Sequence, residues 1–324
     1  MRAIGQDGFG GPEVLKVVEV ERPEPAPAEV LVRVHAAGVN PTDSWHRGSG
    51  GLGGRIVRLG WDVSGVVEAV GIGVTTLAPG DEVFGMPRHP VAAGTYAEYV
   101  TSPARHLLHK PAGLDHTEAA ALPLVGMTAW QALVDTADVR PGQRVLIHAA
   151  AGGVGHLAVQ IAKARGAYVI GTARAAKHEF LRGLGADELI DYTEAEFETA
   201  VEPVDVVIDT IGGAYGPRSL RALKEGGFLV SLASPAESYL AEQARPLGKR
   251  AAFMAVEADQ TGLRELAALV QAGQLRPVID TVLPLELASK AHELLDSGRT
   301  QGKIVLTAVQ TLPGRSCRTG PSGR

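Results

Sequence analysis

Apolar residues in the first part of the chain come in short runs that predict β-strands. Residues 29–39 (EVLVRVHAAGV), 63–74 (VSGVVEAVGIGV) and 94–100 (GTYAEYV) are rich in Val or Tyr, and segments such as APGDEV (78–83) separate the runs. Runs of β-branched or aromatic residues bounded by Gly and Pro are typical of strands joined by turns. We therefore expect residues 1–122 to form a mainly β domain.

From about residue 123 the pattern changes, and apolar strands alternate with helical stretches. The strands expected here are 144–150, 168–173, 188–192, 204–210 and 226–233. This alternation predicts a parallel sheet with helices on both faces. The sequence thus predicts a doubly wound α/β domain over residues 123–257.

The remainder of the chain contains an amphipathic stretch at 261–273 and an apolar strand at 303–309. We expect residues 258–309 to return to the first domain and complete it. Residues 310–324 are polar and rich in Gly and Pro, so they are expected to form a flexible tail.

Composition and charge exclude several classes of protein. The chain has 324 residues, 45% of them hydrophobic and 21% charged, which suits a folded protein with room for about two domains. Its formal net charge of −5 offers no general attraction to nucleic acid or to anionic membranes. No signal peptide or apolar run of about 20 residues is evident, so a cytoplasmic location is expected.

Cysteine usage limits the chemistry further. Cys317 is the only cysteine, so the chain can form no internal disulfide and no metal site with two cysteine ligands. No H-x-x-x-H or similar local spacing is present either. We expect no metal site.

The stretch RVLIHAAAGGVGHLAVQIAKA (144–164) joins a predicted strand to a predicted helix through small residues. It matches A-x-x-G-x-x-G at Ala149, Gly152 and Gly155, and it matches G-x-G-x-x-G only with Ala150 in place of the first glycine. The lack of side chains at Gly152 and Gly153 would let phosphate oxygens approach the backbone at the helix N-terminus, over residues Ala151, Gly152, Gly153, Val154 and Gly155. A small-residue turn without a ligand is the alternative, but the surrounding αβ units favour dinucleotide binding.

The end of the next strand indicates which dinucleotide binds. The segment GTARAAK (171–177), which includes Thr172, carries Arg174 and Lys177 and has no carboxylate before Glu179. NAD sites usually place an acid here for the ribose 2′-hydroxyl, whereas NADP sites carry a cation for the 2′-phosphate. The sequence favours NADP(H), although two ordinary solvated cations would give the same pattern.

Several co-linear motifs resemble those of one known family. They are GVNPTD (38–43), GWDVSGVVEAVG (60–71), PGDEVFG (79–85), GTYAEY (94–99) and GMTAWQAL (126–133). Residues 1–309 resemble the medium-chain dehydrogenase/reductase superfamily, in its zinc-free NADPH:quinone oxidoreductase-like branch. The resemblance implies a GroES-like catalytic domain, a Rossmann domain inserted in it, an active site between the two, and often a homodimer formed through the Rossmann sheet edge.

The resemblance also shows which zinc ligands of the superfamily this sequence lacks. Zinc-dependent members of the superfamily have a cysteine ligand where this sequence has Asn40, and a His-Glu pair where it has Trp61 and Asp62. Without a Lewis acid to stabilise an alkoxide, an activated electrophile is the better substrate. The expected reaction is hydride transfer from NADPH to a quinone or another α,β-unsaturated carbonyl compound, including an enoyl substrate. A metal-free carbonyl or alcohol dehydrogenase and an NADPH-binding sensor with little turnover remain alternatives.

The resemblance assigns roles to individual residues. Asn40 and Thr128 are expected beside the nicotinamide and its ribose, although a loop turn and a helix cap would explain the same residues. Asp43 is interpreted as a structural hydrogen-bond acceptor. Further residues are expected to contact the coenzyme: Arg174, Lys177 and Tyr192 at the 2′-phosphate, and Thr172, Phe253, Ala255 and Lys303 near the nicotinamide or the rest of the cofactor.

Substrate-side residues are less clear from the sequence. Some quinone reductases have tyrosines in the loop after the asparagine, whereas this chain has Trp45, His46 and the glycine-rich stretch 47–55. Trp45 could stack on a flat substrate or simply pack. His46 is a candidate proton donor, because histidines commonly serve as acids near neutral pH, although a loop histidine is more often only solvated. The glycine run suggests an open entrance.

Overall fold

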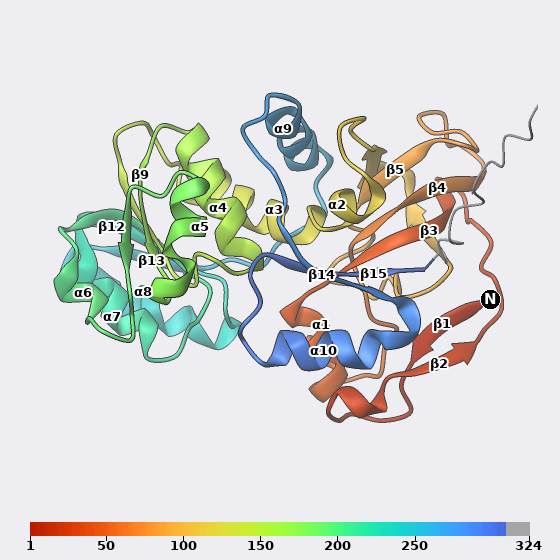
Figure 1. Cartoon of the computed structure of the whole chain (residues 1–324), viewed down its shortest axis with the longest axis horizontal. Coiled ribbons are helices and arrows are strands. Elements are labelled where there is room, and N and C mark those ends of the chain that lie inside the picture. Colours follow the sequence, from red (N-terminus) through yellow and green to blue (C-terminus); the bar gives the residue numbers. More distant parts are fainter. Residues whose placement is uncertain (309–324) are drawn as a thin grey trace, which may run out of the picture.

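Two lobes make up the protein in a computed structural model that describes residues 1–308. The N-terminal strands and the C-terminal segment form one lobe, and the middle of the chain forms the other (Figure 1). The tail expected at 310–324, with Cys317, lies outside the described residues. The domain limits inferred from the sequence remain predictions.

The middle lobe is built on six parallel strands. They are β8 (Arg144–Ile147), β9 (Tyr168–Thr172), β10 (Glu188–Ile190), β11 (Val204–Asp209), β12 (Leu223–Ser231) and β13 (Arg250–Phe253). Their spatial order is β10-β9-β8-β11-β12-β13. Numbered from the first strand of this lobe, the order is 3-2-1-4-5-6, which is that of Rossmann dinucleotide-binding sheets. The order reverses between β8 and β11, and ligands bind at such a point.

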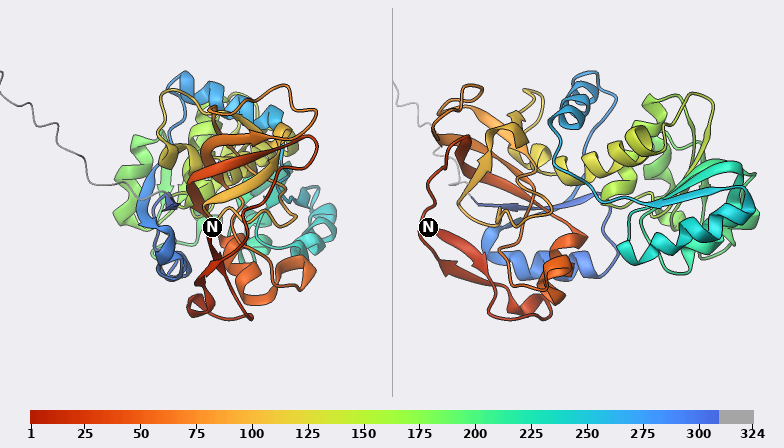
Figure 2. Two further views of the ribbon diagram at one scale, coloured as in Figure 1. Left: turned by 90° about the vertical axis from the view of Figure 1, so that its right-hand side faces the viewer. Right: turned by 180° about the vertical axis from the view of Figure 1, so that it is seen from behind.

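Helices cover both faces of this sheet (Figure 2). They are α4 (Gly153–Ala164), α5 (His178–Gly183), α6 (Phe197–Ala200), α7 (Tyr215–Ala222) and α8 (Leu240–Ala244). The helix α3 (Pro123–Trp130) lies between the lobes and packs against α4 (Figure 1). Successive strand residues point to opposite faces, and in β8 Val145 and Ile147 join one core cluster while Leu146 joins another. Burial on both faces explains why β8 reads as a continuous apolar run.

The other lobe contains a seven-stranded sheet to which both ends of the described chain contribute. Six of its strands follow the order β14-β15-β3-β4-β5-β7, and β6 also pairs with β3. The strands are β3 (Glu29–Val39), β4 (Val63–Val70), β5 (Glu82–Gly85), β6 (Tyr99–Pro103), β7 (Leu107–His109), β14 (Ile279–Pro284) and β15 (Lys303–Thr307). β15 runs antiparallel to β3, with Ile304 opposite Val39. The C-terminal strand β15 therefore pairs with a strand from the N-terminal part of the chain.

Smaller elements complete this lobe. The strands β1 (Arg2–Gly5) and β2 (Lys16–Glu19) form a separate antiparallel pair, and the helices are α1 (Pro41–Ser49), α2 (His116–Ala120), α9 (Gln260–Gln271) and α10 (Ala288–Asp296). Figures 1 and 2 show α1 and α10 side by side beneath the sheet. Together with the Rossmann lobe, this architecture confirms the predicted fold class.

Two local expectations were wrong. The segment after Asn40, expected as a loop, is α1; Pro41 at its first position and Asp43 in its first turn are helix-start signals. The strand expected at 94–100 begins only at Tyr99. Before this strand, the backbone N–H of Thr95 donates to the Gly60 carbonyl and that of Tyr96 donates to the Leu59 carbonyl. These N–H groups therefore pair with a loop and not with a neighbouring strand.

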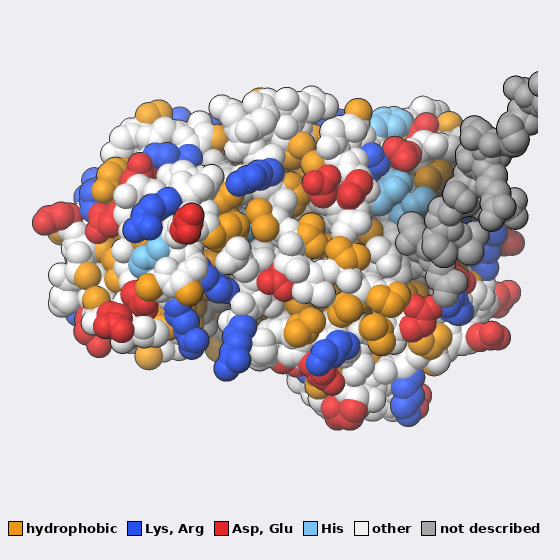
Figure 3. Space-filling view, viewed as in Figure 1, with side chains coloured by type: hydrophobic (Ala, Val, Ile, Leu, Met, Phe, Trp, Pro, Cys, Tyr) orange, Lys and Arg blue, Asp and Glu red, His pale blue; other side chains and the backbone are white. Residues whose placement is uncertain are grey.

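The visible surface carries no extended field of one charge. Figure 3 shows Lys and Arg side chains interspersed with Asp and Glu on this face, with apolar side chains gathered between the lobes. Within residues 1–308, no helix combines the length and apolar character needed to cross a membrane. The cytoplasmic location remains a prediction.

Candidate functional site

The glycine corner, residues 148–155, connects β8 to α4 at the carboxyl edge of the Rossmann sheet. Ala149 has φ +46°, a left-handed conformation that non-glycine residues seldom adopt. At Gly155, an added Cβ would lie 2.4 Å from the carbonyl oxygen of Ala149 and 2.7 Å from the Cα of Ala150. The helix can therefore approach the strand this closely only with glycine at position 155.

The start of α4 is suited to hold an anionic group. The helix begins at Gly153 with no side-chain cap, and the N–H groups of its first turn have no acceptor within the helix. A Cβ added at Gly152 would meet only one atom nearby, the Ala149 carbonyl oxygen at 3.2 Å. Open backbone donors and the positive end of the helix dipole favour a phosphate here. The corner thus fits the pyrophosphate of a dinucleotide.

A buried polar cluster at the end of β3 joins Asn40, Asp62 and Lys303. The Lys303 Nζ donates to Asn40 Oδ1 and to the Val39 carbonyl, each at 2.6 Å. The Asn40 Nδ2 donates to Asp62 Oδ2 at 2.8 Å, and the Lys303 Nζ lies 3.7 Å from that same oxygen. All three side chains are buried, so this cluster is held without help from solvent.

Asp62 extends the cluster to the helix that carries Thr128. Its Oδ1 accepts the backbone N–H of Leu124 at 2.6 Å, in the first turn of α3. The Thr128 hydroxyl, one turn later, donates to the Leu124 carbonyl at 2.7 Å. Thr128 therefore lies inside α3 and is not its cap. One carboxylate links the two residues, Asn40 and Thr128, that were expected beside the nicotinamide.

The electrostatics of this cluster follow from its burial. Burial raises the pKa of Asp62 and lowers the pKa of Lys303, because each loses hydration of its charged form. The attraction between the two charges opposes both shifts, and the hydrogen bonds that Asp62 accepts from Asn40 and Leu124 oppose the shift of Asp62. A carboxylate and an ammonium ion buried together in this way are each needed to compensate the other.

Lys303 also places this cluster against the glycine corner. The backbone N–H of the preceding residue, Gly302, donates to the Ala151 carbonyl at 2.9 Å. A Cβ added at Gly153 would lie 3.3 Å from the Lys303 Cδ. Residues from the two lobes, far apart in the sequence, therefore meet where the strand order of the Rossmann sheet reverses.

The residues expected at the 2′-phosphate lie beyond the ends of two neighbouring strands, Arg174 and Lys177 after β9 and Tyr192 after β10. The Arg174 Nε donates to the Tyr192 hydroxyl at 3.2 Å, and both side chains are exposed. The Lys177 Nζ donates to the carbonyls of Arg299 and Thr300, at 2.8 and 2.9 Å, and burial lowers its pKa. Arg174 and Tyr192 are thus brought together, whereas Lys177 is partly committed to the backbone.

One feature of this region, the carboxylate of Asp191, escaped the sequence analysis. Asp191 follows β10 and accepts the backbone N–H of Ala175 at 2.6 Å, so the neighbouring strand supplies a carboxylate close to Arg174. Hydrogen bonds from Thr193 are the main cause that lowers the pKa of Asp191. Thr172, expected to contact the coenzyme, is buried in the structure, and its hydroxyl lies 3.2 Å from Nδ1 of His148, beneath the sheet edge.

The remaining coenzyme candidates lie at the end of β13. Phe253 is the last residue of this strand and is partly buried, while Ala255 is exposed. The neighbouring Val256 carbonyl accepts a hydrogen bond from Nδ1 of His89 at 3.0 Å, which ties this segment to the other lobe. These backbone groups share the carboxyl edge of the sheet with the glycine corner.

The candidate substrate residues lie on α1. Trp45 is 43% exposed, whereas His46 is buried. The His46 Nδ1 donates to the Thr42 carbonyl at 2.8 Å, and its ring centroid lies 4.7 Å from that of Trp61. Its other face meets Gly51, where an added Cβ would lie 2.4 Å from Nε2. His46 is therefore packed within α1 and the glycine-rich turn rather than solvated.

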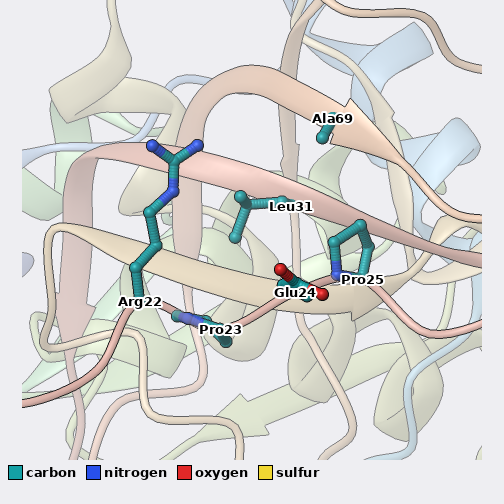
Figure 4. A pocket seen from close by; sticks show the side chains of 6 residues that line it. All are labelled: Arg22, Pro23, Glu24, Pro25, Leu31 and Ala69. Carbon is teal, nitrogen blue, oxygen red and sulfur yellow. The ribbon is translucent and has the colours of Figure 1, made fainter.

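A surface hollow elsewhere on the protein belongs to a different region. It is open and lined by Arg22, Pro23, Glu24, Pro25, Leu31 and Ala69 (Figure 4). Leu31 and Asn40 stand near opposite ends of β3, about 30 Å apart at the usual rise of a strand. The hollow is therefore remote from the buried cluster. Among the described residues, no group of three or more His, Cys, Asp or Glu side chains could hold a metal ion.

Comparisons with known proteins agree with this architecture. Residues 26–112 match the family model of the alcohol dehydrogenase GroES-like domain, and residues 184–306 match that of the zinc-binding dehydrogenase. The chain is 33% identical to a human quinone oxidoreductase, over 94% of this chain and 97% of that protein. It is 34% identical to a mouse mitochondrial NAD(P)H oxidoreductase, over 87% of this chain and 82% of that protein.

Solved structures are similar along nearly the whole chain. The quinone oxidoreductase of Coxiella burnetii superposes with a TM-score of 0.91 at 40% identity, covering 95% of this chain and 99% of that one. The Escherichia coli quinone oxidoreductase complexed with NADPH gives 0.84 at 30% identity, covering 95% and 100%. The chain therefore belongs to the medium-chain dehydrogenase/reductase superfamily, in its quinone oxidoreductase-like branch.

Proposed function

We propose that this protein reduces quinones or other α,β-unsaturated carbonyl compounds, enoyl substrates included, with NADPH as the hydride donor. The wider class, an NAD(P)H oxidoreductase, is the one named for its relatives. The observation that carries the proposal is the contact between the glycine corner and the Lys303–Asn40–Asp62 cluster. It joins a place for the pyrophosphate to a rigid set of polar groups.

The coenzyme is NADP(H), and the chain offers it three places of contact. The N–H groups at the start of α4 and the bare backbone of Gly152 and Gly153 suit the pyrophosphate. Arg174 and Tyr192 suit the 2′-phosphate, with Lys177 nearby. Asn40 and Thr128 then lie toward the nicotinamide, with Phe253 and Ala255 on the same sheet edge.

When bound, NADPH supplies a hydride to the β-carbon of the substrate, whose carbonyl oxygen then gains negative charge. The protein's task is to orient the reactants and to stabilise that charge. Asn40, held on its carbonyl side by Lys303 and on its amide side by Asp62, is fixed for this task. A proton completes the reduction, and solvent or His46 is its proposed source.

The proposed reaction does not depend on zinc. Asn40, Trp61 and Asp62 stand where zinc-dependent members have ligands, and in this chain an ammonium ion lies between Asn40 and Asp62. Trp61 is buried, with its Nε1 bound to the Val91 carbonyl at 2.9 Å. Each of these side chains therefore has its hydrogen-bond partners within the protein. Elemental analysis of the active protein is expected to find no stoichiometric zinc, and one zinc per chain would overturn this part of the proposal.

Turnover tests the proposal directly. Purified protein is mixed with NADPH and a panel of quinones and enones, and loss of reduced nicotinamide absorbance is followed. We expect consumption well above background for at least one class of acceptor, and faster with NADPH than with NADH. Tight NADPH binding without consumption of any acceptor would contradict the enzyme and favour a binding protein.

A homodimer is also proposed. β13 is the edge strand of the Rossmann sheet, and among the described strands it pairs only with β12. An unpaired strand edge can extend a sheet into a second copy. Light scattering after size exclusion should give about twice the mass of one chain, and a monomer at micromolar concentration would contradict the dimer.

A further inference from the structure

Asp43 lies at the centre of a second polar network that the proposed reaction does not use directly. It is buried on α1, and its Oδ2 accepts the backbone N–H of Asn40 at 2.8 Å. Its Oδ1 accepts the backbone N–H of Gly60, also at 2.8 Å. Gly60 directly precedes Trp61 and Asp62. One carboxylate therefore holds both loops that supply the Lys303–Asn40–Asp62 cluster.

A series of neighbouring side chains leads from Asp43 to the surface. Tyr96 is buried; its burial and the nearby charge of Asp43 raise the pKa of its hydroxyl, which lies 3.4 Å from Nε2 of His292. The Nδ1 of His292 lies 2.8 Å from Nη1 of Arg47, and Nη2 of Arg47 donates to Asp296 at 2.8 Å. This series runs across the contact between α1 and α10 (Figures 1 and 2).

The chemistry of these groups determines which of them donates and which accepts each hydrogen bond in the series Arg47–His292–Tyr96. A guanidinium only donates hydrogen bonds, so Nδ1 of His292 must accept from Arg47. A neutral imidazole then carries its proton on Nε2, which donates to the Tyr96 hydroxyl. That hydroxyl in turn directs its own proton toward Asp43. Burial and the charge of Arg47 lower the pKa of His292 to about 4, so its neutral form prevails near pH 7.

We infer that Asp43 is a positioning residue for catalysis, whose carboxylate sets Asn40 relative to the Trp61–Asp62 turn and is itself oriented by the series Tyr96–His292–Arg47. This inference rests on the proposed function, because it assigns Asp43 an effect on the reaction of that site. Two backbone N–H groups converge on the carboxylate, and the Tyr96 hydroxyl lies near it, so its charged form is the one that holds both loops.

The charges around Asp43 make its role dependent on pH. Burial raises the pKa of Asp43 to about 7, and the nearby Asp62 acts in the same direction. The N–H groups of Asn40 and Gly60 oppose this shift, as does the charge of Lys303. Acidification below neutrality therefore protonates Asp43 and loosens the two loops. The acid limb of kcat should report this titration.

Two variants and one control test the inference. Asp43→Asn keeps the size but turns an NH₂ group toward a backbone donor, and Tyr96→Phe removes only the hydroxyl. Asp81→Asn is the control, since Asp81 also accepts a backbone N–H, that of Ala78, in a turn of the same lobe. It has no connection to Asn40.

We expect Asp43→Asn to lower kcat at least tenfold, to change the NADPH dissociation constant less than threefold, and to abolish the acid limb near pH 7. Tyr96→Phe should move that limb to higher pH, because the charged carboxylate loses the dipole of the nearby hydroxyl. Asp81→Asn should do neither. An unchanged acid limb in both test variants, or a kcat loss matched by Asp81→Asn, would overturn the inference.

A second measurement separates this inference from the proposed function. Fluorescence of bound NADPH reports the surroundings of the nicotinamide without any turnover. If the wild-type protein binds NADPH but reduces no acceptor, the proposed function fails, and the emission still decides the effect of Asp43. Emission that is changed by Asp43→Asn and not by Asp81→Asn supports positioning, whereas identical emission in all three proteins refutes it.

Discussion

The ammonium of Lys303, on β15, lies 2.6 Å from the side-chain oxygen of Asn40 at the end of β3. The two residues are 263 positions apart in the sequence, and the whole Rossmann lobe is inserted between them. Their contact exists only because β15 pairs with β3. The pairing of β15 with β3 joins the two parts of the seven-stranded sheet and completes the candidate active site in the same place.

Replacing Lys303 should therefore cost both stability and activity. Lys303→Met leaves the buried Asp62 without its counter-ion, and breaking a buried pair in this way costs about 3–5 kcal/mol. The control Lys290→Met removes an exposed ion pair with Glu293, worth at most about 1 kcal/mol. Urea unfolding of the two variants measures the difference.

The double variant Asp62→Asn/Lys303→Met extends this test. It removes both charges, so its loss of stability should be smaller than the sum of the two single losses. Strict additivity, or a Lys303→Met loss no larger than that of Lys290→Met, would show that the two charges do not depend on one another.

Gly155 should be intolerant of any side chain. A Cβ would lie 2.4 Å from the Ala149 carbonyl oxygen, so Gly155→Ala must push α4 away from β8 and displace the phosphate-binding N–H groups. We expect at least tenfold weaker NADPH binding by fluorescence titration, with a lower Tm. Gly183→Ala is the matched control in α5, because nothing lies within 4 Å of the added Cβ. It should keep full NADPH affinity, with unchanged or slightly higher stability.

Arg174 should select between the two nicotinamide coenzymes. Losing its hydrogen bond to a charged phosphate costs about 1.5 kcal/mol, roughly a tenfold rise in the KM for NADPH after Arg174→Ala. NADH lacks this phosphate, so its KM should change less than twofold. Lys177→Ala should have a smaller effect, since the backbone of Arg299 and Thr300 already engages its ammonium.

A surface control keeps this comparison specific. Arg182 is exposed on α5, and Arg182→Ala should leave both KM values unchanged. Equal rises for NADPH and NADH after Arg174→Ala would remove Arg174 from the 2′-phosphate site.

Patterns within a short stretch of sequence predicted the Rossmann lobe well. The strands of this lobe are apolar and follow one another at regular spacing, and the glycine corner lies where β8 ends. Local periodicity suffices here because each βαβ unit is contiguous in the chain. The corner at Gly155 likewise follows from a local requirement for close approach.

Contacts between distant segments could not be predicted from local sequence patterns. Asp62 was noted only for what it replaces, although an acid within the buried pattern GWDVSG was a signal that it needs a partner. Asp191 reaches Ala175 because β10 lies beside β9. The burial of His46 depends on Trp61 and Gly51, and the start signals of α1 were read as a loop. These outcomes depend on packing that periodicity does not encode.

His148 should make stability depend on pH in a defined direction. Burial lowers its pKa in the folded state from 6.5 to about 3, and its two ring nitrogens lie near the hydroxyls of Thr172 and Ser219. The unfolded chain takes up a proton near pH 6.5, while the folded protein does not until about pH 3. This contribution to stability is therefore complete above pH 6.5 and is lost as the pH falls toward 3.

Replacing His148 isolates this contribution from those of other buried groups, including Asp43, whose raised pKa acts in the opposite direction. Between pH 6 and pH 4.5, the free energy of unfolding of His148→Gln should fall less steeply than that of the wild type, by about 1.4 kcal/mol for each pH unit. The exposed His109 supplies the control His109→Gln, for which the wild-type slope should persist. Chemical denaturation at four pH values measures both slopes. If the free energies of unfolding of His148→Gln and the wild type change in parallel with pH, His148 is already protonated, or solvated, in the folded protein.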